Sequence, residues 1–295
     1  MMKDTNEPIV SRRSQKLKLG IVGHGFVGGA VDYAFTTPHV EKFIVDPKYG
    51  DSSTIENLCD FSPQIVFICA PTPSNDDGSV NYEIVENALR KLLNNTDAFI
   101  VIKSTIPPDV VDSLMSLDMR IAYRPEFLTE GNAKTDFINA PFRIIGISDE
   151  GAKNYVESIF HGFSLCMPSQ FIPMSGVEAS FFKYTINTFL AMKLTFFNQL
   201  YDFMADYGGS YNSLSKAISI DQRIGYSHKT IPGPDGKRGF GGACFPKDLD
   251  GFIHFIENNT EQDPKLLKTV KEINAVYRSA YDLDEREKAN NIKYE

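Results

Sequence analysis

KLGIVGHGFVG, residues 18–28, decides the fold of this 295-residue chain. Its first six residues form a short apolar run, which suits a buried parallel strand. The run enters GHGFVG, in which Gly23, Gly25 and Gly28 match the G-x-G-x-x-G fingerprint of dinucleotide-binding folds. Such glycines admit a pyrophosphate to the N-terminus of the next helix, where backbone N–H groups favour anions. The alternative is a glycine-rich turn that only packs a helix on a sheet.

The flanking residues supply the context that this fingerprint requires. An apolar helical pattern runs through Val27, Ala30 and Phe35, and a second strand, FIVD, ends at Asp46. An acid about 20 residues after the glycines binds ribose hydroxyls and repels a 2′-phosphate. Asp46 therefore favours NAD over NADP, although the nearby Lys48 weakens that preference.

Further strands and helices follow this first unit. Strands are expected at residues 65–70, 99–105, 119–123 and 142–148, with helical stretches such as 82–93 between several of them. This alternation predicts an α/β fold with a Rossmann-like, doubly wound parallel sheet. Its ligands bind beyond the carboxyl ends of the strands, where APTP and STIPP lie. We expect Thr72 and Thr105 of these segments to face that crevice, unless each is an ordinary turn.

Composition and charge exclude several classes of protein. A net charge of −8 argues against broad binding to nucleic acid or acidic membranes. No apolar run approaches the roughly 20 residues that span a bilayer. The four cysteines are scattered without a CxxC pair, which fits neither a disulfide framework nor a zinc site and favours the reducing cytoplasm. Residues 1–17 lack the apolar stretch of a signal peptide and are expected to form a disordered leader.

RPEFLTEG, residues 124–131, carries two acids. If Pro125 begins a helix, Glu126 and Glu130 lie four residues apart on one face. Paired acids can act as a base and a water-orienting group. A solvated helix face is the more common role of two such glutamates.

A long helix is expected to begin at the capping box of Ser175 and Glu178 and to run to Tyr207, before a Gly-Gly pair. Phenylalanines on more than one side are typical of a helix buried between domains or subunits. Lys183 and Asn187 lie four residues apart on it. In one interpretation, Lys183 extends its ammonium group to water and Asn187 is only its neighbour. In the other, the two side chains donate hydrogen bonds to a developing oxyanion.

GFGGACFPKD, residues 239–248, places Cys244 after a glycine-rich loop and before Lys247 and Asp248. Glycines let the backbone approach a ligand closely. A lysine beside a cysteine favours the thiolate, which is the nucleophilic form. The alternative is a small buried cysteine in a loop, as free cysteines usually are.

Seven motifs, in order and spacing, resemble those of the UDP-glucose/GDP-mannose dehydrogenase family over roughly residues 18–274. They are GHGFVG, APTP followed by DGS, KSTIPP, RPEFLTEG, the helix VEASFFKYTINTFLAMKLTFFNQL, DQRIG and GFGGACFPKD. The resemblance implies an NAD-binding domain at 18–172, then a long central helix and a small all-helical dimerisation and catalytic domain at 173–295. It implies NAD-dependent, four-electron oxidation of UDP-glucose to UDP-glucuronate. GDP-mannose and UDP-N-acetylhexosamines are the alternative substrates.

The resemblance also implies roles for the site residues. Cys244 traps an aldehyde as a thiohemiacetal and then carries a thioester, which water releases. Lys183 and Asn187 match the pair that steadies oxygen charge at C6 of the sugar. Asp248 matches an acid that positions a water, and Glu130 is tied to hydrolysis together with Thr105.

The implied contacts extend to a second subunit. Arg223 of DQRIG matches an arginine that reaches the neighbouring subunit's substrate, which implies a homodimer. The implied cofactor contacts are Gly23, Gly25, Phe26, Val27, Gly28, Asp46, Thr72, Thr105, Glu130 and Lys247. The implied substrate contacts are Glu126, Phe127, Leu128, Lys183, Asn187, Arg223, Phe240 and Gly241.

The chain departs from the family after Asp248, where only 47 residues remain (295 − 248). The family normally continues into a further nucleotide-binding-like domain that contributes to the sugar-nucleotide site. The final DLDEREKANNIKYE is polar and is expected to be a fraying helix or tail. A catalytically weak NAD-binding dimer is therefore the alternative to an active enzyme. The retained Cys244, Lys183, Asn187 and Asp248 argue against it.

Overall fold

The computed structural model describes residues 16–129 and 131–294, which fall into two compact units. The first unit holds the described residues up to Pro71, with 82–104 and 108–180. The second holds 72–81, 105–107 and the rest of the chain from Phe181. The leader expected over residues 1–17 lies outside the described residues except for its last two, and Leu17 already begins a strand.

A seven-stranded sheet forms the first unit, in the order β2-β1-β3-β4-β5-β6-β7. Its strands are β1 (Leu17–Val22), β2 (Val40–Val45), β3 (Ile65–Ile68), β4 (Phe99–Ile102), β5 (Ile121–Tyr123), β6 (Phe142–Gly146) and β7 (Gln170–Met174). The first five strands in this order pair in parallel, as expected. One pairing departs from the predicted parallel sheet, because β6 runs antiparallel to β5.

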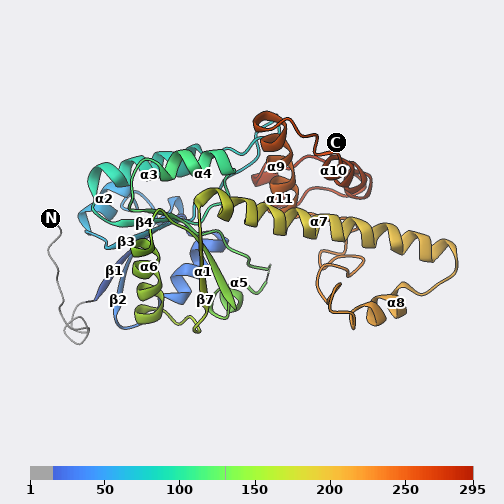
Figure 1. Ribbon diagram of the computed structural model, residues 1–295, viewed down its shortest axis with the longest axis horizontal. Helices are drawn as coiled ribbons and strands as arrows, with labels where there is room; N and C mark the ends of the chain where they lie inside the picture. The colour runs from blue at the N-terminus through green and yellow to red at the C-terminus, as the bar shows by residue number, and fades with distance from the viewer. Residues whose placement is uncertain (1–15, 130, 295) are drawn as a thin grey trace. The chain divides into compact units, whose positions relative to one another are not determined.

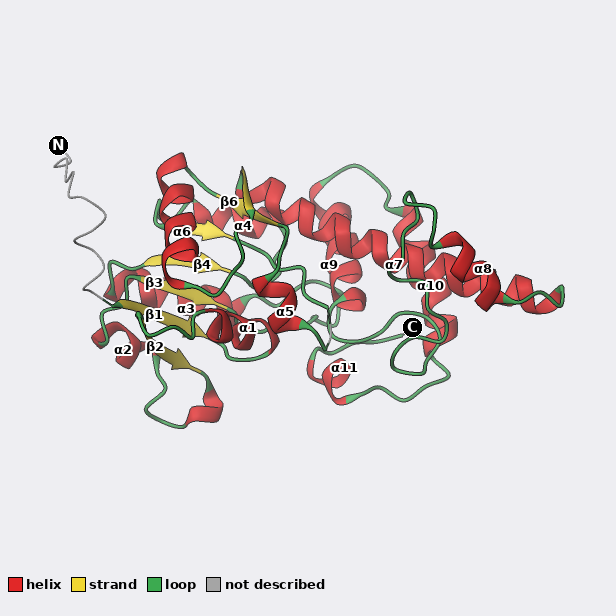
Figure 2. Cartoon of the chain, turned by 90° about the horizontal axis from the view of Figure 1, so that it is seen from below, coloured by secondary structure: helices red, strands yellow, loops and turns green. Residues whose placement is uncertain are grey.

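Helices cover both faces of this sheet, so its central strands read as continuous apolar runs (Figures 1 and 2). Every residue of β3 is buried. Residues of α1 (Phe26–Ala34), α5 (Ala133–Ile138) and α6 (Glu150–Phe163) share one core cluster on one face. The helices α2 (Ile55–Asp60), α3 (Glu83–Asn95) and α4 (Pro108–Met115) belong to the same unit.

The second unit is helical and is organised around α7 (Gly176–Asp206), whose first turn belongs to the first unit. The predicted capping box is confirmed, since Ser175 N–H donates to Glu178 at 2.8 Å and Glu178 N–H donates to Ser175 Oγ at 3.2 Å. The other helices are α8 (Tyr211–Ile218), α9 (Phe245–Asn259), α10 (Lys265–Arg278) and α11 (Glu285–Ala289). No helix among the residues described is long and apolar enough to cross a membrane.

The C-terminal segment is an ordered part of the second unit, which corrects the expectation of a fraying tail. Asp284 and Glu287 form a capping box at the start of α11. The side chains of Glu287 and Ile292 are buried. The segment looks polar in sequence because its main buried group is the carboxylate of Glu287. That carboxylate accepts hydrogen bonds from other parts of the unit, among them Arg278 of α10.

Candidate active site

The glycine fingerprint forms a tight turn between β1 and α1, at the point where the strand order reverses. A Cβ added at Gly28 would lie 1.9 Å from the carbonyl oxygen of Gly23, so only glycine lets the helix start this close to the strand. At Gly25, by contrast, a Cβ would meet open space, and Gly25 and Phe26 are exposed. No side chain caps this end of α1. Backbone N–H groups at such a helix start suit the pyrophosphate of a dinucleotide.

Asp46 at the end of β2 is held by the same turn. Its carboxylate accepts hydrogen bonds from the backbone N–H of His24 at 2.6 Å and of Lys48 at 3.1 Å. Partial burial raises the pKa of Asp46, but these bonds and the nearby cation outweigh it and hold the pKa below its usual value. The Lys48 ammonium donates to the carbonyl oxygen of His24 at 2.5 Å. An ionised carboxylate in this position fits the ribose hydroxyls of NAD.

The two threonine loops beyond the strand ends meet each other. The Thr72 hydroxyl donates to the carbonyl oxygen of Thr105 at 3.0 Å, and the Thr72 side chain is buried. Both threonines belong to the second unit by their packing, although they follow strands of the first. The bond ties the loop after β3 to the loop after β4.

Residues 124–129 of RPEFLTEG do not form a helix, so the expected helix start at Pro125 is wrong. The backbone is irregular from Arg124 to Thr129, and α5 begins only at Ala133. Glu126 instead turns inward and forms ion pairs with Lys103 and Arg124. Glu130 lies outside the described residues.

This buried cluster of one carboxylate and two cations is electrostatically coupled. Burial, followed by the charge of Arg124, lowers the pKa of Lys103 to about 8. Burial opposes ionisation of Glu126, but Arg124 and Lys103 overcome it and lower the pKa of that carboxyl. The cluster therefore keeps Glu126 charged at the carboxyl ends of β4 and β5.

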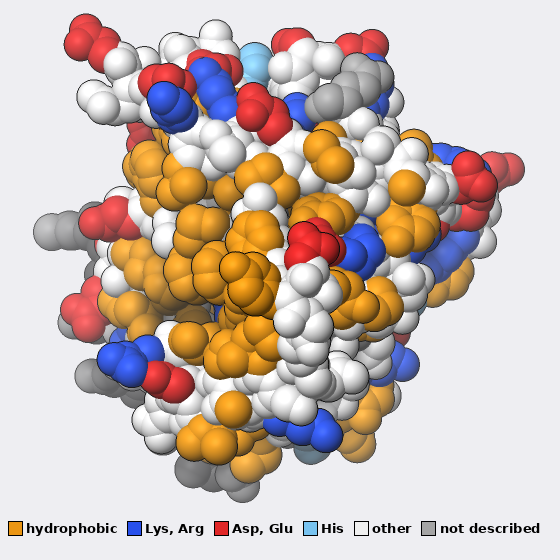
Figure 3. Space-filling model, turned by 90° about the vertical axis from the view of Figure 1, so that its right-hand side faces the viewer, with side chains coloured by type: hydrophobic (Ala, Val, Ile, Leu, Met, Phe, Trp, Pro, Cys, Tyr) orange, Lys and Arg blue, Asp and Glu red, His pale blue; other side chains and the backbone are white. Residues whose placement is uncertain are grey.

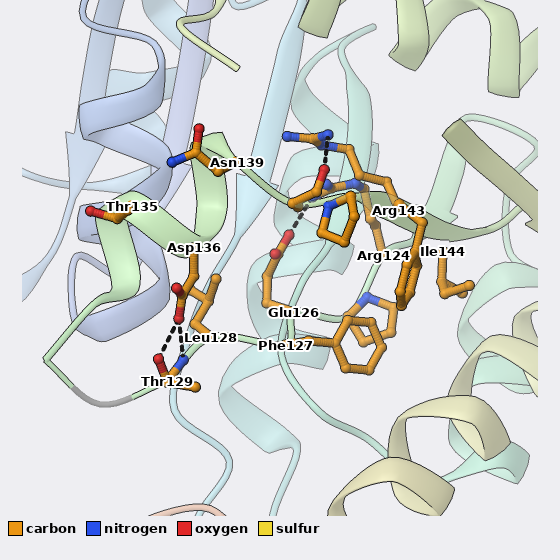
Figure 4. Close-up of a pocket in the computed structure, with 14 residues that line it drawn as sticks. Arg124, Glu126, Phe127, Leu128, Thr129, Thr135, Asp136, Asn139, Arg143 and Ile144 are labelled. Carbon is orange, nitrogen blue, oxygen red and sulfur yellow. Dashed lines mark hydrogen bonds and ion pairs between the residues drawn. The ribbon is translucent and has the colours of Figure 1, made fainter. Parts of the chain in front are cut away.

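A cavity of about 380 Å³ lies beside this cluster in the first unit (Figure 4). Phe127 and Leu128 line it, and the Phe127 ring lies 6.2 Å from the ring of Phe142. On its opposite wall Thr129 donates its backbone N–H to Asp136 at 2.8 Å. The cavity is lined by residues 124–129 and by residues of α5, of β6 and of the segment between them.

In the second unit, four of the predicted residues form one buried hydrogen-bonded network. Lys183 Nζ donates to Asn187 Oδ1 at 3.3 Å, and Asn187 Nδ2 donates to Asp248 Oδ2 at 2.5 Å. Lys247 Nζ completes the network by an ion pair to Asp248 Oδ1 at 2.6 Å. All four residues are less than 9 % exposed. Two helices, α7 and α9, thus bring two cations and one carboxylate together.

Cys244 is the N-cap residue of α9, beside this network. The residue is exposed at the surface, yet the protein atoms crowded around the thiol disfavour its charged form. This desolvation, with the carboxylate of Asp248, raises the pKa of Cys244 above its usual value. The charges of Lys183 and Lys247 act in the opposite direction without reversing it. The predicted influence of lysine on the thiol is therefore present, but burial and Asp248 outweigh it.

Phe240 and the loop around it are held by α10. Asn274 accepts a hydrogen bond from Phe240 N–H at 2.7 Å and donates to the Phe240 carbonyl oxygen at 2.9 Å. The Phe240 side chain is buried in the core with Leu249 and Ile253. Any ligand near Phe240 would therefore meet its backbone rather than its ring.

Gly241 lies against a buried ion pair. A Cβ there would fall 2.1 Å from the Arg278 guanidinium and 2.6 Å from the Glu287 carboxylate. Arg278 and Glu287 pair at 2.7 Å, with side chains 1 % and 0 % exposed. The glycine is thus required by the chain's own packing.

Arg223 is not part of these networks. Its side chain is 89 % exposed and pairs with Asp221 at 2.5 Å.

The sequence analysis assigned no role to two residues that the structure buries, Lys103 of KSTIPP and Glu287. The D-x-x-E capping pattern of Asp284 and Glu287 was a signal for the second.

Comparisons with known proteins match both parts of the chain to one family. Residues 52–164 match the NAD binding domain of the UDP-glucose/GDP-mannose dehydrogenase family, and residues 177–276 match the central domain of that family. The UDP-glucose 6-dehydrogenase of Rickettsia felis is 34% identical over 215 residues, which cover 70% of this chain and 46% of the relative. That of Bacillus subtilis is 31% identical over 224 residues, covering 71% and 48%. The chain therefore spans about half the length of the curated relatives it matches.

A solved structure extends the similarity. A UDP-glucose dehydrogenase from the archaeon Pyrobaculum islandicum superposes with a TM-score of 0.76 at 26% sequence identity, over 90% of this chain and 69% of that one. The cofactor of the matched domain is NAD, consistent with the fingerprint and with Asp46. With two domains matched in order and the motifs of both present, the chain belongs to the UDP-glucose/GDP-mannose dehydrogenase family.

Proposed function

We propose that this protein oxidises the C6 primary alcohol of UDP-glucose to a carboxylate in two NAD-dependent steps, with Cys244 as the covalent nucleophile. The observation that carries the proposal is the buried network of Lys183, Asn187, Asp248 and Lys247 beside an exposed thiol. NAD supplies the two-electron acceptor for each step, one molecule at a time. The first oxidation converts the alcohol to an aldehyde.

The network accounts for the proton and oxygen chemistry of this site. It carries two ammonium groups against one carboxylate, so its net charge is positive where an alkoxide oxygen would develop. Donors fixed in a buried site stabilise such an oxygen by several kcal/mol, about 3–4 by analogy with oxyanion donors. Because Asn187 accepts from Lys183 and donates to Asp248, its amide orientation is set before substrate arrives.

Cys244 retains the aldehyde between the two oxidations. Its Sγ bonds to C6 of the aldehyde, and the thiol proton passes to the aldehyde oxygen, which gives a thiohemiacetal. The second oxidation gives a thioester, and water then cleaves the C6–S bond to release the carboxylate and the thiol.

UDP-glucose is the proposed substrate because the curated relatives at 31–34% identity are UDP-glucose 6-dehydrogenases. GDP-mannose and UDP-N-acetylhexosamines are the alternatives for the same chemistry. A silent NAD-binding dimer is less well supported, since a protein without catalysis has no need for a lysine, an amide and a carboxylate buried together beside a thiol. NADH formation with each sugar nucleotide distinguishes these alternatives.

The chain is also proposed to work as a homodimer. Phe189, Phe196 and Phe203 recur every seven residues along α7 and are 54–60% exposed, so one face of the helix presents an apolar stripe. Apolar side chains gather on the face shown in Figure 3. A second copy would cover the stripe and bring Arg223 toward the neighbouring site. Light scattering should find a dimer for the wild type and a monomer for Phe196→Asp; a monomeric wild type contradicts the proposal.

The test of the function is the ratio of NADH formed to sugar nucleotide consumed. Purified protein with UDP-glucose should form two NADH for each UDP-glucuronate, whereas GDP-mannose and UDP-N-acetylglucosamine should give little. A ratio of one would reject the double oxidation. Turnover with another sugar nucleotide alone would reassign the substrate.

Cys244→Ser tests the nucleophile separately. It should abolish UDP-glucuronate formation while NAD still binds, as measured by calorimetry. Cys59→Ser is the matched control, because it makes the same atom change in α2, remote in sequence from the glycine loop. Undiminished product from Cys244→Ser defeats the covalent mechanism.

A further inference from the structure

Glu287 of α11 is a buried carboxylate of the second unit that the proposed reaction leaves without a role. Its Oε1 accepts hydrogen bonds from Gly242 N–H at 3.1 Å, Arg278 at 2.7 Å and the Tyr294 hydroxyl at 2.7 Å. Its Oε2 accepts from Asp284 N–H at 2.9 Å. The side chain is 0 % exposed. One carboxylate thus joins the glycine loop, α10 and both ends of the C-terminal segment.

The same segment also binds the hairpin that follows Thr72. Residues 74 and 80 form an antiparallel bridge, and Ser74 N–H donates to the carbonyl oxygen of Asn290 at 3.1 Å. The Asn291 amide donates back to the Ser74 carbonyl oxygen at 3.1 Å, and Lys293 pairs with Asp76 at 2.8 Å. Residues 284–294, which we call the C-terminal clip, therefore contact two loops that are more than 150 residues apart in sequence.

The hairpin packs on the helix that Cys244 begins. A Cβ at Gly251 of α9 would lie 2.6 Å from Cγ2 of Val80, so hairpin and helix are in direct contact there. The clip, the hairpin, the glycine loop and α9 thus form a closed ring of contacts. Within this ring Gly242 lies only two residues before Cys244.

We infer that Glu287 is a positioning residue for Cys244, which acts by holding the Gly242 amide and the Arg278 guanidinium so that the glycine loop presents the thiol in one orientation. The clip holds the hairpin after Thr72 through the same segment. Positioning matters because a displacement of about 1 Å at reacting atoms can cost on the order of a hundredfold in rate. The inference rests on the proposed function in taking Cys244 as the nucleophile.

The clip also adds charge near the thiol. Arg286 precedes Glu287 on α11, and its charge lowers the pKa of Cys244, alongside Lys183 and Lys247 and against Asp248.

The test compares Glu287→Ala and Glu287→Gln with Glu285→Gln, a control on the same helix whose side chain is 89% exposed. Each full-length variant is assayed well below its melting temperature for NADH formation from UDP-glucose. We expect Glu287→Ala to lower kcat on the order of tenfold or more with little change in the Kd for NAD. Glu287→Gln keeps an acceptor oxygen for Gly242 and should recover part of the rate. Glu285→Gln should match the wild type.

The second measurement is the pH profile of Cys244 alkylation by iodoacetamide, followed by mass spectrometry of the Cys244 peptide. Loosening the loop should relieve the desolvation that raises the pKa of the Cys244 thiol, so in Glu287→Ala the midpoint should move toward that of an ordinary cysteine. Alkylation needs no turnover, so it tests the inference even if the wild type forms no NADH. A folded Glu287→Ala with wild-type kcat and alkylation profile overturns the inference, as does a Glu287→Gln no better than Glu287→Ala.

If Glu287→Ala does not fold, two milder variants replace it. Tyr294→Phe removes one hydrogen bond to the carboxylate, and Asn291→Ala removes the bond to the Ser74 carbonyl oxygen. Both variants should lower kcat and move the alkylation midpoint in the direction expected for Glu287→Ala, by smaller amounts. Wild-type behaviour of both variants would refute the role of the clip.

Discussion

Gly241→Ala should destabilise the second unit far more than a glycine-to-alanine change usually does. The new Cβ would lie 2.1 Å from the guanidinium nitrogen of Arg278, and ordinary contact begins at 3.4 Å. The guanidinium must therefore move by about 1.3 Å, which breaks its 2.7 Å pairing with Glu287. Losing one partner of a buried ion pair costs about 3–5 kcal/mol. Because both partners remain and can partly adjust, we expect about 3 kcal/mol.

A loss of about 3 kcal/mol lowers the melting temperature of a unit of this size by roughly 10 °C. Differential scanning calorimetry measures it directly. Gly162→Ala is the control, because Gly162 lies in α6 with nothing within 4 Å of the added Cβ. That change should be neutral or stabilise by about 0.5–1 kcal/mol, since alanine favours a helix over glycine. A Gly241→Ala protein that melts with the wild type would refute the argument that the glycine loop is packed against this ion pair.

Two more predictions concern the buried charges. Glu126→Gln leaves Lys103 and Arg124 without their carboxylate and should lower the free energy of unfolding by about 3–5 kcal/mol. Lys103→Met leaves Arg124 and Glu126 as a neutral pair and should lower it clearly less. Urea unfolding compares the two variants, and equal losses would contradict the pairing. The pKa of Glu287 is lowered to about 2, because the hydrogen bonds it accepts and the charge of Arg278 outweigh its burial. Its folded pKa is depressed, so its stabilising contribution is complete above the unfolded value near 4.5 and is lost as the pH falls toward about 2. The difference in free energy of unfolding between wild type and Glu287→Gln should therefore shrink as the pH falls through that window. A difference that stays constant would show that folding does not change the pKa of this carboxylate.

Local sequence signals predicted most of the first unit. The strands β3 and β4 are continuous apolar runs, and β1 is interrupted only by Lys18. A short apolar run of that kind between turn residues is consistent with a buried strand. The glycine fingerprint was equally local, since the close approach at Gly28 is to a residue only five positions earlier. The start of α7 was predicted from a capping box of neighbouring residues.

The errors lie where a partner comes from far along the chain. The expected helix is absent over residues 124–129, where Glu126 pairs with Lys103, 23 residues earlier. The C-terminal segment was expected to fray because its residues are polar. It is ordered because Arg278 and the Gly242 amide offer its carboxylate a buried partner.

The candidate site divides in the same way. Short motifs in the sequence identified Cys244, Lys183, Asn187 and Asp248, because spacing on a helix or after a glycine loop is a local property. The tertiary structure alone decided that Lys183, Asn187 and Asp248 join Lys247 in one network beside the thiol, that the pKa of Cys244 is raised, and that Glu287 accepts a hydrogen bond from Gly242 in the loop before it. Local periodicity determines where a helix or strand forms, but the charge state of a buried group depends on which distant side chains the fold brings within hydrogen-bonding distance.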